Sequence, residues 1–232
     1  MPEGKEIIYA SGSKVHNLSL WRISASGSGR PKPLPFSGED IALEPAISLQ
    51  ADRLVYRRMS SDFNIWRCQI ATAAEKPAAP SRLMASTRVQ ESAQHSPDGK
   101  SIAYVAWTSG SSEIWVCDRD GTNPLQLTRL GGRTPFGPHW SPDGQKLVFG
   151  TAAKGHTDLF VIPAQGGEIR QLTRTPFNEG SPTYSRDGRW IYFGSDRSGV
   201  SEVWKMPADG GEAVQVTRKG GSNPLESTNG KM

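Results

Sequence analysis

The tetrapeptide SPDG stands at residues 96–99 and again at 141–144, and the variant SRDG stands at 185–188. STNG at 227–230 is a weaker fourth copy, so successive copies begin 45, 44 and 42 positions apart. SLQA at 48–51 and PEG at 2–4 hold the same place upstream in altered form. A fixed period of this length is typical of proteins built from repeated small units. The chain therefore contains about five repeats.

Two further columns keep the same period. LTR recurs at 127–129 and 172–174, and VTR stands at 216–218. A large aromatic residue, preceded each time by Leu, Ile or Val, recurs at Trp21, Trp66, Trp115, Phe160 and Trp204. Three independent columns in one register do not arise by chance, and we expect the aromatic column to pack between repeats.

Each repeat is predicted to form four β-strands. After the turn come three successive apolar residues, as in IAY at 102–104 or LVF at 147–149. A strand that is apolar on both faces must be covered on both faces. The aromatic strand, a glycine turn such as DRDG or PAQGG, a third strand ending in LTR, and a short strand before the next SPDG complete the unit. Four antiparallel strands per unit, in stacked sheets, predict an all-β protein with the blades of a β-propeller.

One propeller domain over residues 1–232 is expected, with units near 2–48, 49–96, 97–141, 142–185 and 186–227. The first unit lacks its innermost strand, and residues 222–227 would supply it in a closed five-bladed ring. Alternatively, TNGK at 228–231 begins another unit, and the chain is a C-terminally truncated part of a propeller with six or more blades. Both interpretations remain open at this point.

Composition excludes several classes of protein. A net charge of +4 falls short of a nucleic-acid-binding face, so no nucleic-acid partner is expected. The sequence has neither an apolar run long enough to cross a bilayer nor the apolar stretch of a signal peptide at its start. We expect no membrane insertion by this chain, and a cytoplasmic location as written, or a periplasmic one if a targeting segment is missing. The two cysteines, Cys68 and Cys117, are expected to be free and buried.

SPDGKSIAYV at 96–105, SSEIWVCDRDG at 111–121, NPLQLTR at 123–129 and SPDGQKLVFG at 141–150 resemble the WD-repeat-like repeats of bacterial TolB-type β-propellers. The resemblance covers essentially the whole chain and is strongest over residues 96–221. It implies a propeller that acts in protein–protein interaction. Related repeats form the substrate-gating propeller of prolyl-oligopeptidase-type serine peptidases, and others are appended to bacterial winged-helix regulators and kinases. These motifs are specific for the fold and carry little information on function.

No motif for catalysis, metal or cofactor binding stands out. GxSxG, HExxH and phosphate-loop patterns are absent, and SGSK at 11–14 matches SxxK without its partner motifs. DRDG at 118–121 has part of a calcium pattern but is interpreted as a hairpin turn. We therefore expect a non-catalytic scaffold for a protein or peptide partner, with no cofactor. The alternatives are a peptidase-gating propeller or a sensory module of a larger bacterial regulator.

The candidate binding residues lie in the short strands that should line the central channel. Strict strand alternation places the residues two and four positions before each turn serine toward the channel. The polar residues Glu44, Gln94, His139 and Thr183 come from four units and vary within a repeated pattern. Such variation is where specificity can reside, although a water-filled channel tolerates any polar side chain. Glu44 is the only acid among these channel positions, which disfavours a glycosidase.

Arg129, Arg174 and Arg218 repeat in the LTR column. They are expected to form a basic outer edge, either for an acidic partner or merely for solubility.

Overall fold

The computed structural model describes residues 6–11, 18–34, 41–47, 54–59, 64–68, 79–84, 89–108, 110–153 and 155–227. The motifs at 2–4 and 48–51, and most of those at 11–14 and 227–230, lie outside these ranges. The regular structure of the described residues consists of β-strands, and none of them forms a helix with the length and hydrophobicity of a membrane span. The chain divides into two compact units, Met1–Asp62 and Phe63–Met232.

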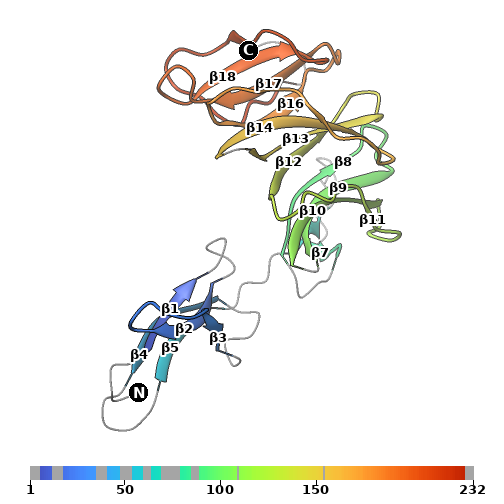
Figure 1. Cartoon of the computed structure of the whole chain (residues 1–232). Coiled ribbons are helices and arrows are strands. Elements are labelled where there is room, and N and C mark those ends of the chain that lie inside the picture. Colours follow the sequence, from blue (N-terminus) through green and yellow to red (C-terminus); the bar gives the residue numbers. More distant parts are fainter. Residues whose placement is uncertain are drawn as a thin grey trace. The chain divides into compact units, whose positions relative to one another are not determined.

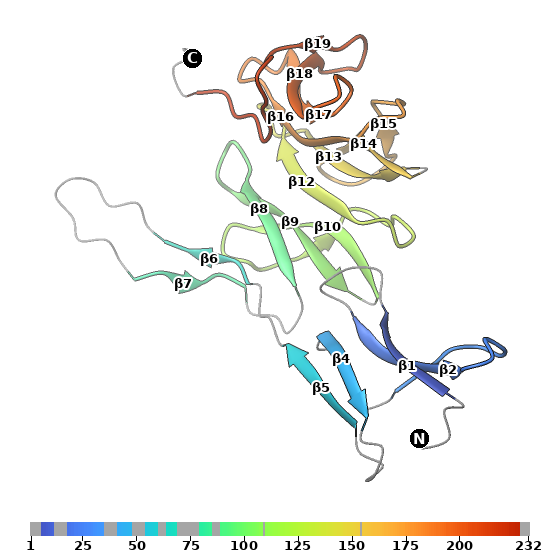
Figure 2. The same ribbon diagram turned by 90° about the vertical axis from the view of Figure 1, so that its left-hand side faces the viewer.

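The first unit contains a three-stranded antiparallel sheet and a two-stranded one (Figures 1 and 2). The three-stranded sheet has the order β1-β2-β3, and β4 pairs with β5. Their bounds are β1 Glu6–Ser11, β2 Ser19–Ser24, β3 Lys32–Pro33, β4 Ile41–Ile47 and β5 Leu54–Met59. The buried side chains of Leu20 and Leu34 form a small core, against which Ile8, Leu54 and Tyr56 pack.

The second unit contains the short pair β6 and β7, followed by three four-stranded antiparallel sheets. In each of the three, the strands lie side by side in chain order. The bounds are β6 Trp66–Arg67 and β7 Ser81–Arg82; β8 Gln90–His95, β9 Ser101–Thr108, β10 Ser111–Asp118 and β11 Leu125–Gln126; β12 Pro135–Trp140, β13 Lys146–Ala153, β14 His156–Pro163 and β15 Arg170–Gln171; β16 Glu179–Tyr184, β17 Trp190–Ser195, β18 Glu202–Pro207 and β19 Val214–Gln215. The predicted four-stranded antiparallel pattern is confirmed in these three sheets, whereas the described strands of residues 6–82 form one sheet of three strands and two sheets of two.

The SPDG motif forms the hairpin between the first and second strand of each sheet. The Ser96 hydroxyl donates a hydrogen bond to Asp98 Oδ1 at 2.6 Å and accepts one from the Ser101 amide at 2.9 Å. The Ser96 hydroxyl, followed by the Lys100 amide, lowers the pKa of Asp98 by stabilising its carboxylate. The same bonds form around Ser141 with Asp143, and around Ser185 with Asp187. The motif is thus a structural device that fixes each hairpin.

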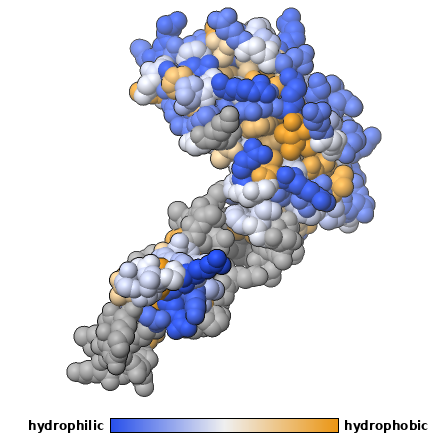
Figure 3. Space-filling model, viewed as in Figure 1, coloured by the Kyte–Doolittle hydropathy of each residue, from blue (hydrophilic) through white to orange (hydrophobic). Residues whose placement is uncertain are grey.

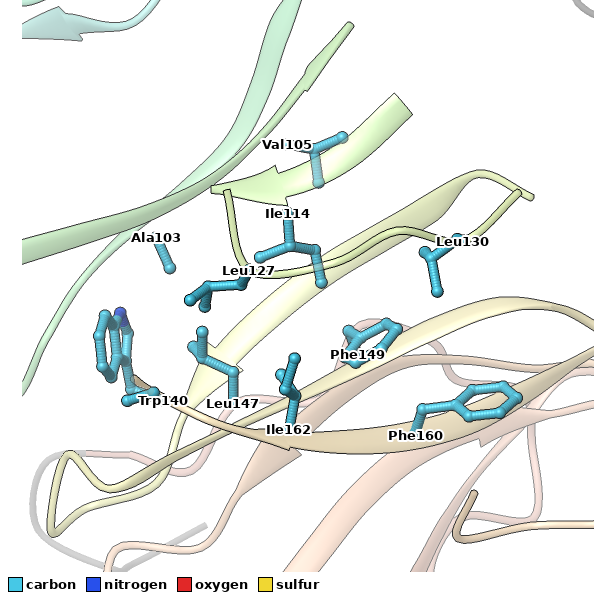
Figure 4. Packing of buried hydrophobic residues seen from close by; sticks show 11 residues of the cluster. Ala103, Val105, Ile114, Leu127, Leu130, Trp140, Leu147, Phe149, Phe160 and Ile162 are labelled. Carbon is cyan, nitrogen blue, oxygen red and sulfur yellow. The ribbon is translucent and has the colours of Figure 1, made fainter. Parts of the chain in front are cut away.

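The main core of the second unit lies between neighbouring sheets. Figure 4 shows Ala103, Val105 and Ile114 of the β8–β11 sheet facing Leu147 and Phe149 of the β12–β15 sheet. The intervening residues of β9, Ile102 and Tyr104, point into a different cluster that contains Met84. Strand β9 is therefore covered on both faces, as its apolar sequence predicts. In Figure 3 the apolar surface gathers over the middle of this unit, and most of its remaining described surface in that view is hydrophilic.

The recurring aromatic residues are buried or half-buried in the four-stranded sheets, but the one in the short pair of strands β6 and β7 is exposed. Phe160 is 6% exposed and Trp115 is half-buried, whereas Trp66 is 58% exposed. The expectation of packing between repeats is therefore wrong for Trp66, because β6 has two residues and, within the described part of the chain, pairs with β7 alone. Likewise, Cys117 is buried as predicted, but Cys68, which directly follows β6, is exposed.

Candidate functional site

The innermost strand of each four-stranded sheet is β8, β12 or β16, and each carries a β-bulge at the same place. The pairing register shifts between Glu91 and Gln94 in β8, and at the matching positions in β12 and β16. The residue four positions before the turn serine has a positive φ: 56° at Ser92, 56° at Gly137 and 49° at Ser181. Strand β4 has a register shift at the same place, between Leu43 and Ala46.

The bulge interrupts the strict alternation assumed for the channel positions. In β12 and β16 the residue after the positive-φ position is a proline, Pro138 or Pro182. Proline has no N–H group, so the bulge leaves no amide unpaired there. The proline three positions before Ser141 and Ser185 was a sequence signal for this irregularity in two of the three sheets, whereas β8 has Ala93 at that position. Alternation alone misses the bulge.

The bulges bring the innermost segments of successive sheets together. A methyl group built on Gly137 would lie 3.8 Å from the Cα of Ser181. The Ser181 hydroxyl donates a 2.5 Å hydrogen bond to Oδ1 of Asn223, which has a φ of 51°. The residues four positions before the turn serines therefore lie next to one another in successive repeats.

His139 lies half-buried between β12 and β16. Its Nδ1 atom is 3.3 Å from the backbone nitrogen of Tyr184 and 3.0 Å from the backbone oxygen of Trp140. These contacts require opposite tautomers. We assign Nδ1 as the acceptor, because the Tyr184 amide can only donate and an unpaired buried amide is costly. Burial lowers the pKa of His139 below 6.5, which keeps the ring neutral and able to accept.

The other predicted residues also lie where neighbouring sheets meet. The indole nitrogen of Trp140 donates to the backbone oxygen of Gln94 at 3.2 Å. The Thr183 hydroxyl donates to the backbone oxygen of Pro224 at 3.1 Å. Gln94, His139 and Thr183 thus occupy equivalent positions in three successive innermost strands of the second unit. Glu44 belongs to β4 of the first unit, and its side chain lies outside the described residues.

A set of buried carboxylates was missed at the sequence level. Glu113 is nearly fully buried, and its carboxylate accepts hydrogen bonds from the Thr128 hydroxyl at 2.7 Å and the Leu130 amide at 3.0 Å. The same hydroxyl accepts a 2.9 Å hydrogen bond from the amide of Ile114. Asp158 with Thr173, and Glu202 with Thr217, repeat this arrangement. The threonine of the LTR column therefore fastens the third strand to the second. The sequence signal was an acid two positions before the aromatic residue in these three repeats.

One further buried acid belongs to the last four-stranded sheet. Glu179 begins β16 and is fully buried, where it forms an ion pair with Arg197 and accepts a 2.7 Å hydrogen bond from the Thr175 hydroxyl. The Arg197 guanidinium lies 4.8 Å from the centre of the Trp204 ring. Gln90 and Pro135 stand at the matching positions of the other sheets, so this ion pair is not part of the repeat. Its charge is neutralised inside the protein.

The DRDG motif forms the hairpin turn that its sequence predicts. Asp120 accepts a 2.6 Å hydrogen bond from the Thr122 hydroxyl, and Asp118 accepts a 2.7 Å bond from the Asn123 amide group, so DRDG is a self-contained turn. No group of three or more His, Cys, Asp or Glu residues among those described is placed to hold a metal ion. Arg129, Arg174 and Arg218 are all exposed.

Comparison with known proteins identifies the repeats. Residues 77–232 match the family model described as the TolB beta propeller domain. The chain belongs to this family. It is therefore a TolB-type β-propeller chain, as the repeat motifs imply. No curated protein matches the sequence significantly.

Solved structures agree on the fold. A putative TolB from Agrobacterium tumefaciens has a TM-score of 0.59 at 22% identity over 82% of this chain and 66% of its own. TolB from Acinetobacter baumannii has a TM-score of 0.54 at 21% identity over 92% of this chain and 53% of its own. A puromycin hydrolase has a TM-score of 0.53 at 18% identity over 93% of this chain and 38% of its own. This TolB-type chain thus spans less than two thirds of the length of each of these proteins.

Proposed function

We propose that this TolB-type chain is a non-catalytic scaffold that binds a protein or peptide partner at its innermost strands. The proposal rests on the position two residues before the turn serine, where the side chain differs between repeats although the sheets have the same topology. Gln94, His139 and Thr183 stand two residues before the turn serine in sheets of identical topology. A surface to which several strands each contribute a different side chain is suited to recognition.

The buried acids support a non-catalytic role. Glycoside hydrolysis needs two opposed carboxyl groups within roughly 5–9.5 Å of each other, with room for substrate between them. Glu113, Asp158 and Glu202 instead each accept hydrogen bonds from a threonine hydroxyl of the same sheet. Glu179 is neutralised by Arg197. These carboxylates hold strands together and have no free face for a substrate.

A binding experiment tests this function. Peptides selected by display on the purified chain are titrated against the unchanged protein, Gln94→Ala and Thr183→Val. We expect each variant to weaken binding by about tenfold, as for a residue at the centre of an interface. Arg129→Ala is the matched control, because Arg129 is exposed in the loop that follows β11. Equal weakening by the control, or turnover of ester, peptide or glycoside substrates well above blank, would contradict the proposal.

The Gln94 variant also separates binding from folding. The contact of Gln94 with Trp140 uses the backbone oxygen, which the substitution retains. We therefore expect Gln94→Ala to change the free energy of unfolding by no more than about 1 kcal/mol. A much larger loss would mean that the side chain acts in packing between sheets and not in recognition.

A second candidate is the substrate-gating propeller of a larger serine peptidase. It is favoured by the likeness to puromycin hydrolase, of which this chain matches 38%. The likeness concerns the fold alone, because the identity is 18%. An α/β-hydrolase domain encoded next to this segment in the genome would support the peptidase role, and a winged-helix or kinase domain would support a sensory module.

A further inference from the structure

The loop between β15 and β16 departs from the repeat. Two and three residues after the arginine of the LTR column, the segments after β11 and β19 have glycine pairs, Gly131–Gly132 and Gly220–Gly221. The loop after β15 has Pro176 and Phe177 at those places. Proline restricts the backbone, whereas glycine leaves it free. A rigid residue and a large aromatic side chain, which is 39% exposed, thus replace two flexible residues.

Hydrogen bonds fasten this loop to the hairpin between β17 and β18. The backbone amide and the side-chain nitrogen of Asn178 donate to the two carboxylate oxygens of Asp196, at 2.8 and 2.7 Å. Glu179 accepts a hydrogen bond from the Thr175 hydroxyl and pairs with Arg197 of the same hairpin. The ion pair that does not belong to the repeat therefore supports this loop. Its aromatic residue stands between two anchored positions.

The positive charge at the start of the loop is unpaired. Arg174 is exposed, and among the residues that the structure describes no carboxylate forms an ion pair with it. The two acids of the loop and the hairpin are engaged within the protein, as described above. At the opposite end of the sheets, near the SPDG turns, Lys146 and Arg170 instead form ion pairs with Asp209. Arg174 is therefore available to a carboxylate from outside.

The other two arginines of the LTR column add positive charge at a greater distance. Arg129 and Arg218 are both exposed. The hairpin between β17 and β18 lies between Arg218 and the loop after β15, and the hairpin between β13 and β14 lies on the side of Arg129, because each hairpin is hydrogen-bonded to the segments on both of its sides. We expect these two arginines to attract an anion without contacting it, and salt weakens such attraction beyond about 10 Å.

We propose that Arg174 and Phe177 form a docking surface for an acidic segment of a partner protein. A carboxylate of that segment pairs with the planar guanidinium group, and an apolar side chain next to it packs on the ring. Arginine and large aromatic side chains often carry most of the binding energy at protein interfaces. Because the loop is already held in place, little ordering is needed when the partner binds.

A membrane or a nucleic acid fits this surface less well. Segments that bind anionic lipids carry clusters of about four to eight Lys and Arg residues. Single-stranded nucleic acids stack successive bases on several aromatic rings, whereas residues 174–179 contain one aromatic residue.

The surface is also separate from the proposed site on the innermost strands. Gln94, His139 and Thr183 stand next to the SPDG turns, at the other end of those strands. The inference therefore does not rest on the proposed function.

A subtractive peptide selection on the full chain tests the proposal. A random displayed peptide library is first depleted on Phe177→Gly and then selected on the unchanged chain. The variant has the residue of the matching loops, Gly132 and Gly221, so its thermal midpoint should stay within about 4 °C. Depletion also removes peptides that bind at the innermost strands, so failure here and failure of the proposed function are distinguishable.

We expect the surviving peptides to be enriched in Asp or Glu next to an apolar residue. Enrichment of basic or uncharged peptides, or no enrichment at all, would overturn the proposal.

Titration of an enriched peptide separates contact from distant attraction. We expect Arg174→Ala and Phe177→Gly each to weaken binding about tenfold or more. Arg129→Ala is the matched control, since it removes the same charge beside a Gly–Gly pair, and it should weaken binding about twofold or less at 0.1 M salt. Equal weakening by all three variants would mean general attraction and would overturn the docking surface.

Two further probes cover the other classes of partner. Vesicles of phosphatidylcholine with phosphatidylserine, and a single-stranded oligonucleotide, are titrated against the unchanged chain and Arg174→Ala. Binding of either probe that is tighter than that of the enriched peptide and is lost in Arg174→Ala would overturn the proposal in favour of a membrane or a nucleic acid.

Discussion

The ring of Phe136 lies directly against the backbone of Gly150, which β12 and β13 place opposite each other. A methyl group on Gly150 would overlap this ring. We predict that Gly150→Ala lowers the free energy of unfolding by about 1–3 kcal/mol, because the packed interface has to shift. Urea denaturation followed by tryptophan fluorescence measures this loss.

A double variant checks the cause. In the presence of Phe136→Leu, the same Gly150→Ala change should cost clearly less, since neighbouring residues that collide show coupled effects. Additive losses would mean that Gly150 matters for a reason other than the ring.

The hydroxyl of Thr128 joins the Glu113 carboxylate to the amide of Ile114, at a site closed to solvent. Thr128→Val removes the hydroxyl while keeping the shape of the side chain. We predict a loss of about 1–3 kcal/mol in thermal or urea unfolding, the cost of leaving a buried polar group without its partner. Thr128→Ser keeps the hydroxyl and should lose clearly less than the valine variant. An equal loss from both would contradict this role.

At the scale of elements, we expect the contact of β12 with β16 to depend on pH through His139. Its pKa is lowered in the folded protein, mainly by burial. The unfolded chain therefore takes up a proton that the folded one resists. The contribution of neutral His139 to the free energy of unfolding is therefore fully present above about pH 6.5. It is lost as the pH falls toward the pKa of His139 in the folded protein. The protonated ring can no longer accept a hydrogen bond from Tyr184.

We predict that His139→Gln flattens the pH dependence of the unfolding free energy below about pH 6.5. Glutamine offers an acceptor that does not titrate in this range, and it is the residue at the matching position 94. Urea unfolding at a series of pH values measures the slope. An unchanged slope would assign the acid sensitivity to other groups.

The turns and strands could be predicted where every repeat has the same residue type at a position and that residue type favours one local structure. The SPDG turns, the strands apolar on both faces and the LTR strands follow from such columns. The bulges were not predicted, because the positive-φ position has no constant residue: it is serine at Ser92 and Ser181 and glycine at Gly137. Strict alternation of side chains along the innermost strand does not hold across the bulge, because the backbone is irregular there.

The buried carboxylates were missed for a different reason. Glutamate and aspartate are usually exposed, so the sequence alone does not place Glu113 and Asp158 in the core. Their burial depends on a threonine that lies 15 residues away in the chain. Of the candidate residues, Gln94, His139 and Thr183 could be placed in successive innermost strands from the sequence, but the hydrogen bonds that join those strands could not.

At the scale of the whole molecule, the chain contains two units with separate cores. Residues 63–232 hold the three larger clusters of buried side chains, and the first unit holds its own small one. We predict that a fragment of residues 63–232 folds by itself, since a unit with its own core is able to do so. Its near-UV circular dichroism should retain the signal of packed aromatic residues. A fragment with far-UV strand signal but no near-UV signal would contradict independent folding.

The threonine–carboxylate pairs affect how individual amides exchange with heavy water. In each four-stranded sheet the threonine hydroxyl holds the amide hydrogen of Ile114, Leu159 or Val203, and the carboxylate beyond it fixes that hydroxyl. An amide held in this way is released only when the third strand separates from the second. Hydrogen exchange at these three positions therefore reports the opening of three separate sheets, and the chain carries in each of them a natural gauge of local stability.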